Sequence, residues 1–224
     1  MLIAKGNILC FDYIDSIEKK FQIFYASVLI ASSIKQFIYY KSKYPDKIIH
    51  LINHHVDPRI NIHKQNNYEL KIGYFGEKEN GLYLDKLQDF LIPNYINTKE
   101  NSNSNWISQL NKFNAHYIVR KTNNKKVFKP FLKGFTAAHC ASNVIAYKFD
   151  GDSHFYLNDE YPYLLENDSF KNTIDMFNYM QDTFKTDIWL KGLEIMKEVK
   201  YKSSKKYIVN QFTTLMKIIN SNDF

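Results

Sequence analysis

The sequence predicts an α/β protein in which parallel sheets are covered by helices on both faces. Several short apolar runs recur along the chain, and each is followed by a polar or helical segment. Apolar runs of this length are typical of buried parallel strands, and their alternation with helices predicts a doubly wound arrangement. The runs are Asn7–Phe11, Ser27–Ala31, Lys47–Ile52, Glu69–Phe75, His116–Val119 and Asn143–Tyr147.

The composition is that of a folded globular protein with a basic surface. The 224 residues suffice for one large domain or two small ones, and 45% of them are hydrophobic, which is enough to build a core. The net charge of +7 favours anionic partners such as phosphates, acidic polymers or an anionic membrane face. The charge alone does not choose among these partners.

Cysteine content and hydropathy indicate a reducing compartment. Cys10 and Cys140 are the only cysteines, and they provide neither a disulfide framework nor the spacing of a metal site. The longest apolar stretch, Phe21–Ile34, falls short of the roughly 20 residues that cross a bilayer. The N-terminus also lacks the pattern of a secretory signal. We therefore expect a cytoplasmic protein, with peripheral contact at the inner membrane face as an alternative.

A polar linker divides the chain into two unequal parts. Val28–Ser33 is typical of a strand that runs into a Ser-Ser turn. Val56–Asn67 is polar and poorly periodic, which is typical of a loop or linker. We place the boundary near Ile60, which gives a segment of residues 1–59 and a larger domain of residues 60–224.

The larger domain begins with a strand, a turn and a helix. Glu69–Gly76 predicts the strand, Gly76–Gly81 the turn, and Tyr83–Phe90 a short amphipathic helix. The Asn/Ser tract of residues 101–105 is expected to be exposed. Beyond Asp168 the spacing of apolar residues becomes helical. Helices are expected from Phe170 to Met180, from Ile188 to Lys200 and from Tyr207 to Ile219.

The most informative segment begins at Arg120. A strand that ends there would place the guanidinium at the carboxyl edge of a parallel sheet, where open α/β sheets bind ligands. Pro130 suits the first turn of a following helix, and the small residues Thr136–Ala138 let that helix pack closely. The helix N-terminus would offer free N–H groups to an anion. Arg120, Lys129 and Lys133 would then surround a diphosphate, although an exposed basic face is an equal alternative.

These features resemble the C-terminal half of GT-B glycosyltransferases, over the stretch from Pro45 to Phe170. Two earlier segments fit the same family: residues 54–59 resemble its interdomain linker, and residues 72–77 resemble the first strand and loop of its domain for the sugar donor. No single motif is diagnostic, and the order of the motifs carries the resemblance. The remaining matches are Lys129-Pro130, Lys133-Gly134, Thr136-Ala137-Ala138, Asn143-Val144-Ile145 and Asp159–Leu164.

The resemblance implies a GT-B-like, Rossmann-type domain that binds a nucleotide-diphosphate sugar, with no metal or other cofactor. It assigns Arg120, Lys129 and Lys133 to the phosphates of the sugar donor. It assigns Phe135 and Thr136 to backbone contacts with phosphate or sugar. Tyr161 and Tyr163 either line the pocket for the sugar donor or form a rigid packed turn.

The sequence departs from the family in two ways. The Glu-x7-Glu pattern is not cleanly present, because Glu160 and Glu166 are six residues apart. The domain that holds the acceptor in this family matches only the short segment 1–59 here, which is therefore expected to be a reduced acceptor side.

Residues of the linker, His54, His55 and Asp57, are candidates for a metal site or a general base. A structural role in the linker is the favoured interpretation, because no further ligand follows at a suitable spacing.

Other reactive residues also have structural interpretations that we favour. His139 and Cys140 are adjacent on the expected helix, so core packing is favoured over a nucleophilic pair. Asp150 and Asp152 flank a glycine, which is typical of a turn rather than a metal site. The lysine-rich run Lys197–Lys206 is expected to be a solvated helix end, with membrane contact as the minor alternative.

The first functional hypothesis is a glycosyltransferase that moves a sugar from a nucleotide diphosphate to a saccharide or lipid-linked acceptor. The second is a non-catalytic remnant of such a domain that acts as a partner subunit. A nucleic-acid-binding protein is a third possibility, but no recognition motif specifies one.

Overall fold

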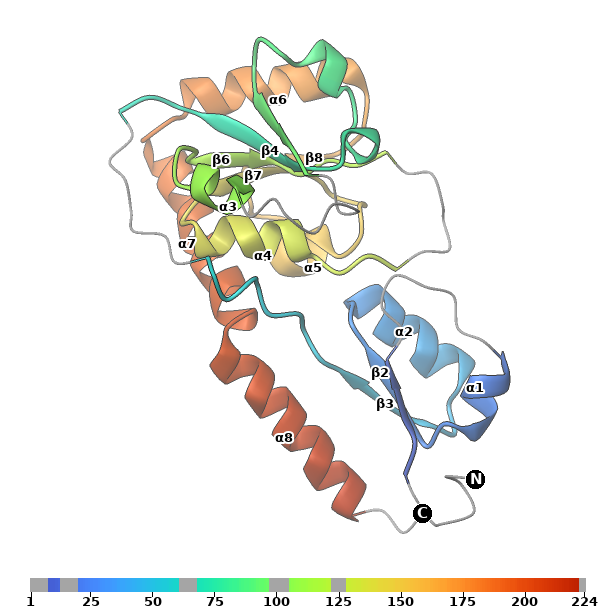
Figure 1. Ribbon diagram of the computed structural model, residues 1–224. Helices are drawn as coiled ribbons and strands as arrows, with labels where there is room; N and C mark the ends of the chain where they lie inside the picture. Colours follow the sequence, from blue (N-terminus) through green and yellow to red (C-terminus); the bar gives the residue numbers. More distant parts are fainter. Residues whose placement is uncertain (1–7, 13–19, 61–67, 97–104, 122–127, 222–224) are drawn as a thin grey trace.

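The computed structural model describes residues 8–12, 20–60, 68–96, 105–121 and 128–221. These described residues form two parallel sheets, one of three strands and one of five. Figure 1 shows the two sheets with their own helices and the C-terminal helices running from one sheet to the other. Within the described ranges, no helix is both long and apolar enough to cross a membrane.

The smaller sheet is built from the N-terminal residues. Its elements are β1 (Cys10–Asp12), α1 (Lys20–Tyr25), β2 (Val28–Ala31), α2 (Ile34–Lys43) and β3 (Ile48–Leu51). The strand order is β1-β2-β3, and all neighbours are parallel. The Ser33 hydroxyl caps α2 by accepting a hydrogen bond of 3.0 Å from the Gln36 amide. The predicted Ser-Ser turn is thus the start of this helix.

The larger sheet follows the linker. Its strands are β4 (Ile72–Gly76), β5 (Ile92–Tyr95), β6 (Ala115–Tyr117), β7 (Asn143–Tyr147) and β8 (Leu164–Leu165). Val144, Ile145 and Ala146 of β7 are fully buried, as expected for a strand in a sheet covered on both faces. The helical segments are η2 (Lys78–Asn80), η3 (Leu84–Lys86), α3 (Asn105–Leu110), α4 (Leu132–His139), α5 (Ser153–Leu157), α6 (Phe170–Asp182), α7 (Asp187–Lys202) and α8 (Lys205–Ser221).

The strand order of the larger sheet reverses beside β4. The order is β5-β4-β6-β7-β8, and every neighbouring pair is parallel. The chain passes from β4 to the edge strand β5 and then returns to β6 on the other side of β4. The connection after β4 leads toward β5, whereas the connection after β6 leads toward β7 on the other side. These diverging connections open a crevice at the carboxyl ends of β4 and β6.

Helices cover both faces of the larger sheet, with α6 on one side and α4 and α7 on the other (Figure 1). Phe177 of α6 lies 5.5 Å from the Tyr117 ring of β6, measured between centroids. On the other face, Gly192 lets α7 approach β7, because a Cβ there would lie 2.5 Å from Asn143 Oδ1. Close packing on both faces fixes the carboxyl edge of the sheet.

The last helix crosses to the smaller sheet. Leu215 and Ile219 of α8 pack against Val28 of β2. Asn53, just after β3, donates from Nδ2 to the Lys202 carbonyl at 2.9 Å and from its amide to Gln211 Oε1 at 2.9 Å. The division of the chain near residue 60 stays a prediction, and it groups α8 with the larger sheet although α8 packs on the smaller one.

The predicted fold class is confirmed, but one predicted helix does not form as expected. The segment Tyr83–Phe90 was expected to be an amphipathic α-helix, whereas only the short 3-10 helix Leu84–Lys86 forms there. Tyr83 adopts a left-handed conformation with φ of 58°, which interrupts a regular helix at this point. The expected exposed tract of residues 101–105 lies almost entirely outside the described residues.

The buried His116 predicts how stability depends on pH. Its Nε2 has no hydrogen-bond partner among the described residues, and burial lowers its pKa to about 3. The unfolded chain therefore takes up a proton below a pH of about 6.5 that the folded chain cannot accept, so stability falls as the pH falls. Below a pH of about 6.5, His116 should lower the free energy of unfolding by up to about 1.4 kcal/mol for each pH unit. His116→Phe should remove this contribution, which urea unfolding at several pH values measures. An unchanged slope would contradict the assignment, and His55→Gln, at an exposed histidine, is the control.

Candidate functional site

The crevice is lined on one side by the end of β4. Gly76 closes this strand with a φ of 152°, a conformation that favours glycine. A Cβ at this position would lie 2.8 Å from Lys133 Nζ and 3.1 Å from the Tyr74 hydroxyl. Glycine therefore allows the side chain of Lys133 to reach the end of β4.

Lys133 is the central cation of this crevice. Its stem is partly exposed, whereas its amine is buried and has no hydrogen-bond partner among the described residues. The Nζ atom lies 4.1 Å from the centre of the Tyr74 ring, which provides a cation–π contact. Burial, and then the nearby charge of Arg120, lower the pKa of Lys133 to about 7.

Arg120 approaches from the neighbouring strand. It lies three residues beyond β6, and an antiparallel bridge to Gly81 holds its backbone. Its Nε atom donates to Asp150 Oδ2 at 3.2 Å, and 22% of the side chain is exposed. The structure thus brings Arg120 and Lys133 to one edge, as the sequence predicted, and adds Asp150 as a partner that the sequence did not indicate.

The N-terminus of α4 faces the same edge. Phe131 is its N-cap residue and makes no side-chain capping bond. The first amides of a helix have no acceptor within the helix, so those of Leu132, Lys133 and Gly134 are available to a ligand. Phe135 and Thr136, expected to make backbone contacts, lie further along the helix. The Phe135 amide already donates to the Phe131 carbonyl at 3.0 Å. The contacts expected of Phe135 and Thr136 stay a prediction.

Lys129 reaches this edge through its backbone. Gly151 adopts a φ of 52°, and a Cβ there would lie 3.0 Å from the Lys129 carbonyl oxygen and 3.2 Å from Arg120 Nη2. Glycine at position 151 therefore lets the turn after β7 lie directly beside both basic residues. Lys129, Arg120 and Lys133 come from three different segments of the larger sheet domain.

The structure does not bring Tyr161 and Tyr163 to this edge. The Tyr161 hydroxyl accepts from the Val144 amide at 2.7 Å, near the amino end of β7. The Tyr163 hydroxyl bonds Thr183 Oγ1 at 3.0 Å, and the ring is fully buried. Both tyrosines are core residues, which agrees with a rigid packed turn rather than a pocket lining.

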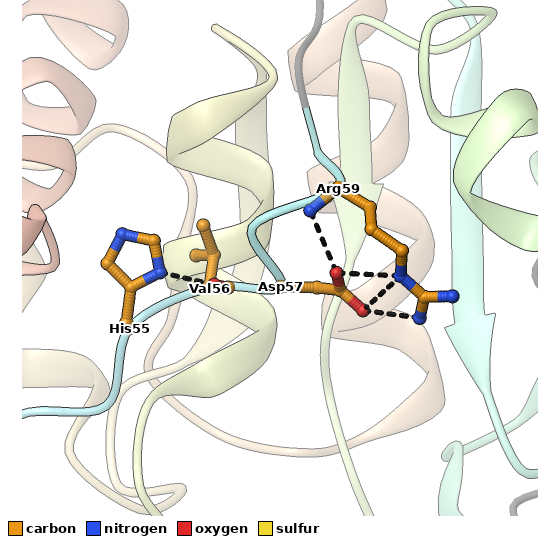
Figure 2. Close-up of polar contacts among 4 residues, drawn as sticks. All are labelled: His55, Val56, Asp57 and Arg59. Carbon is orange, nitrogen blue, oxygen red and sulfur yellow. Dashed lines mark hydrogen bonds and ion pairs between the residues drawn. The ribbon is translucent and has the colours of Figure 1, made fainter.

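The linker residues do not form a shared site. Figure 2 shows His55 and Asp57 pointing away from each other. His55 Nδ1 lies 2.5 Å from the Val56 carbonyl oxygen, and Asp57 binds Arg59 with a shortest distance of 2.6 Å. The charge of His54 lowers the pKa of Asp12, although burial raises it by more. Nowhere in the described part of the chain do three or more His, Cys, Asp or Glu side chains gather as a metal site.

Asp152 connects the crevice to the smaller sheet. Its carboxylate accepts hydrogen bonds from the amides of Ile34 at 2.7 Å and Lys35 at 3.0 Å, at the N-terminus of α2. The Lys35 amine also donates to the Phe149 carbonyl at 2.9 Å. The carboxyl edges of the two sheets therefore face each other. Asp152 contacts the amides at the start of α2 and Asp150 contacts Arg120, so both carboxylates make structural contacts.

Comparison with known proteins supports this arrangement at the level of the fold. No protein-family model and no curated protein matches the sequence. HepE from Anabaena in complex with UDP matches with a TM-score of 0.68 and 11% identity, over 99% of this chain and 74% of that chain. A glycosyltransferase from Rickettsia africae matches with a TM-score of 0.64 and 13% identity, over 96% of this chain and 71% of that chain. The chain has a GT-B fold.

The matched structures extend beyond this chain. In the GtfA/B complex the match has a TM-score of 0.61 and 11% identity, and it covers 90% of this chain but 47% of that chain. At such identities the likeness concerns the GT-B fold. The sugar donor, acceptor and reaction must be argued from the residues of this chain.

The buried amine of Lys133 predicts a conflict between stability and ligand binding. A buried polar group without a partner costs about 1–3 kcal/mol, so Lys133→Met should raise the free energy of unfolding by about that amount near pH 7. Because the folded pKa is lowered to about 7, the wild type gains stability as the pH rises from 7 toward 10.5, and the advantage of the variant shrinks. Urea unfolding at several pH values measures both effects. A destabilised Lys133→Met variant would show that the amine is structural, and Lys197→Met, at an exposed lysine, is the control.

Proposed function

We propose that this chain binds the diphosphate of a nucleotide sugar in the crevice between β4 and β6. The observation that carries the proposal is the buried amine of Lys133, which lies beside Arg120 where the strand order reverses and has no hydrogen-bond partner among the described residues. Two cations and an uncapped helix N-terminus converge there, which is the chemistry that recognises phosphate. The matched HepE structures contain UDP or UDP-glucose, which supports a nucleotide sugar as the ligand here.

In the proposed reaction, the same groups stabilise the leaving diphosphate. Negative charge develops on the diphosphate as its bond to the sugar breaks. Arg120 supplies a fixed planar cation held by Asp150, Lys133 supplies a mobile point charge, and the amides of α4 add the positive end of the helix dipole. The carboxylates near this edge already accept hydrogen bonds, Asp150 from Arg120 and Glu77 from Asn80. We therefore propose that the sugar donor binds here through positive groups, without a metal cofactor.

Calorimetric titration with UDP and GDP tests the binding step. We expect one of these nucleotides to bind to the wild type. Arg120→Ala and Lys133→Met should each weaken its binding about tenfold or more, because each removes a charge-assisted contact to phosphate. Lys197→Ala, which changes an exposed lysine paired with Glu194, is the matched control. Absence of nucleotide binding to the wild type would remove the proposal.

Sugar transfer is the further part of the proposal. We propose a saccharide or lipid-linked acceptor that enters between the facing edges of the two sheets. The alternative is a protein that binds the sugar donor and acts only with a partner subunit. Release of UDP from UDP-glucose by the purified chain, measured with and without acceptor sugars, distinguishes them. Turnover by the chain alone rules out the non-catalytic alternative, and binding without turnover favours it.

Contact with a membrane surface is a second proposal, and α8 supports it. This helix contains no acidic residue. Its exposed apolar residues, Val209, Phe212 and Met216, recur at helical spacing, and Lys205 and Lys206 are exposed at its start. An amphipathic basic helix of this kind suits an anionic lipid surface in the cytoplasm, where unpaired Cys10 and Cys140 would stay reduced.

Sedimentation with anionic phosphatidylglycerol vesicles tests the membrane proposal. Phe212→Ser should weaken vesicle binding about tenfold, because it removes about 1.5–3 kcal/mol of apolar burial. Thr214→Ser, on the same helix, should bind as the wild type does. Equal binding to uncharged phosphatidylcholine vesicles would contradict an electrostatic contact, and self-association without lipid would indicate that the face pairs with a second copy.

A further inference from the structure

The amine of Lys133 is buried without a counter-charge of its own. Its Nζ atom has no hydrogen-bond partner in the described part of the chain. The Tyr74 ring, whose centre lies 4.1 Å from Nζ, provides a cation–π contact. A cation–π contact offsets only part of the cost of burying an ammonium ion. Without a bound anion, these surroundings therefore favour the uncharged amine.

The charged groups around Lys133 do not supply the missing compensation. Arg120 has the same sign and disfavours a second positive charge. The Asp150 carboxylate favours it, but this group already accepts from Arg120 at 3.2 Å. The Glu77 carboxylate also favours it but accepts from Asn80 Nδ2 at 2.9 Å. Other ionisable groups on the adjoining segments are Tyr95, which lies 6.5 Å from the Tyr74 ring, Lys78 and Lys129.

A bound diphosphate would reverse this balance. Burial lowers the pKa of Lys133 to about 7, from an ordinary value of 10.5. An opposite charge within a few ångströms favours the charged form of an amine and raises its pKa. The stem of Lys133 is partly exposed, so rotation about its flexible carbons can turn the amine from Tyr74 toward a ligand at the N-terminus of α4.

We propose that the crevice binds a diphosphate and a proton together, and that the Lys133 amine carries the proton. The proton comes from solvent, and no bond of the ligand changes. The inference rests on the proposed function only for the identity of the ligand. Lys133 is in this way a specificity-determining residue, because its charge forms when an ionised phosphate enters and not when a neutral ligand of similar shape does.

Calorimetry in two buffers measures the proton directly. Wild-type protein is titrated with UDP and with inorganic pyrophosphate at about pH 8, in HEPES and in Tris, which differ in ionisation enthalpy. The difference in heat should correspond to uptake of about one proton per ligand. The affinity should also fall up to about tenfold per pH unit above pH 7. Lys133→Met should bind both ligands more weakly, without proton uptake through position 133, and its affinity should depend less on pH. The control Lys197→Met should match the wild type in affinity and in proton uptake.

The outcomes separate this inference from the proposed function. UDP binding with the same heat in both buffers would overturn the inference and leave the proposed sugar-donor site intact. Pyrophosphate binding with proton uptake, but no binding of a nucleotide, would support the inference and remove the proposed function. If the wild type bound neither ligand, both would be overturned. Equal proton uptake by Lys133→Met would place the proton on another group and would also overturn the inference.

Discussion

The structure depends on the reversal of strand order beside β4 in a sheet that is parallel throughout. The connections after β4 and after β6 lead in opposite directions and do not close over the ends of these two strands, so an open edge remains. Gly76 lets the chain turn sharply at this edge and leaves space for the side chain of Lys133. The amino end of α4 points to the same place because α4 leads from this edge into β7. The site is thus a consequence of the topology.

The chemistry of the edge follows from an imbalance of charge. Arg120 has a carboxylate partner in Asp150, whereas the amine of Lys133 has none among the described residues. Most buried polar groups in folded proteins have partners, so an unsatisfied amine at an open edge is a candidate position for contact with an anionic ligand. The facing edge of the smaller sheet is held by Asp152 at the N-terminus of α2. The proposed ligand therefore enters a crevice whose walls are already fixed.

Most of the fold, and part of the site, could be predicted from sequence. Continuous apolar runs identified the central strands, and Asn143–Tyr147 was predicted with the bounds of β7. The edge strand Ile92–Tyr95 was missed because it contains a proline and an asparagine and lacks a clear apolar pattern. Arg120 and Lys133 were proposed because the sequence indicates a strand before one and a helix around the other, although β6 ends earlier, at Tyr117, and α4 begins at Leu132. The roles of Tyr161 and Asp150 depend on contacts across the sheet, which sequence spacing does not show.

The central claim is that Lys133, Arg120 and the N-terminus of α4 bind the diphosphate of a nucleotide. A crystal structure of the chain in complex with UDP tests it most directly. The account predicts that the diphosphate lies beside Gly76, within hydrogen-bond distance of both side chains and of the first amides of α4. Phosphates bound elsewhere, with the Lys133 amine still buried against Tyr74, would contradict it.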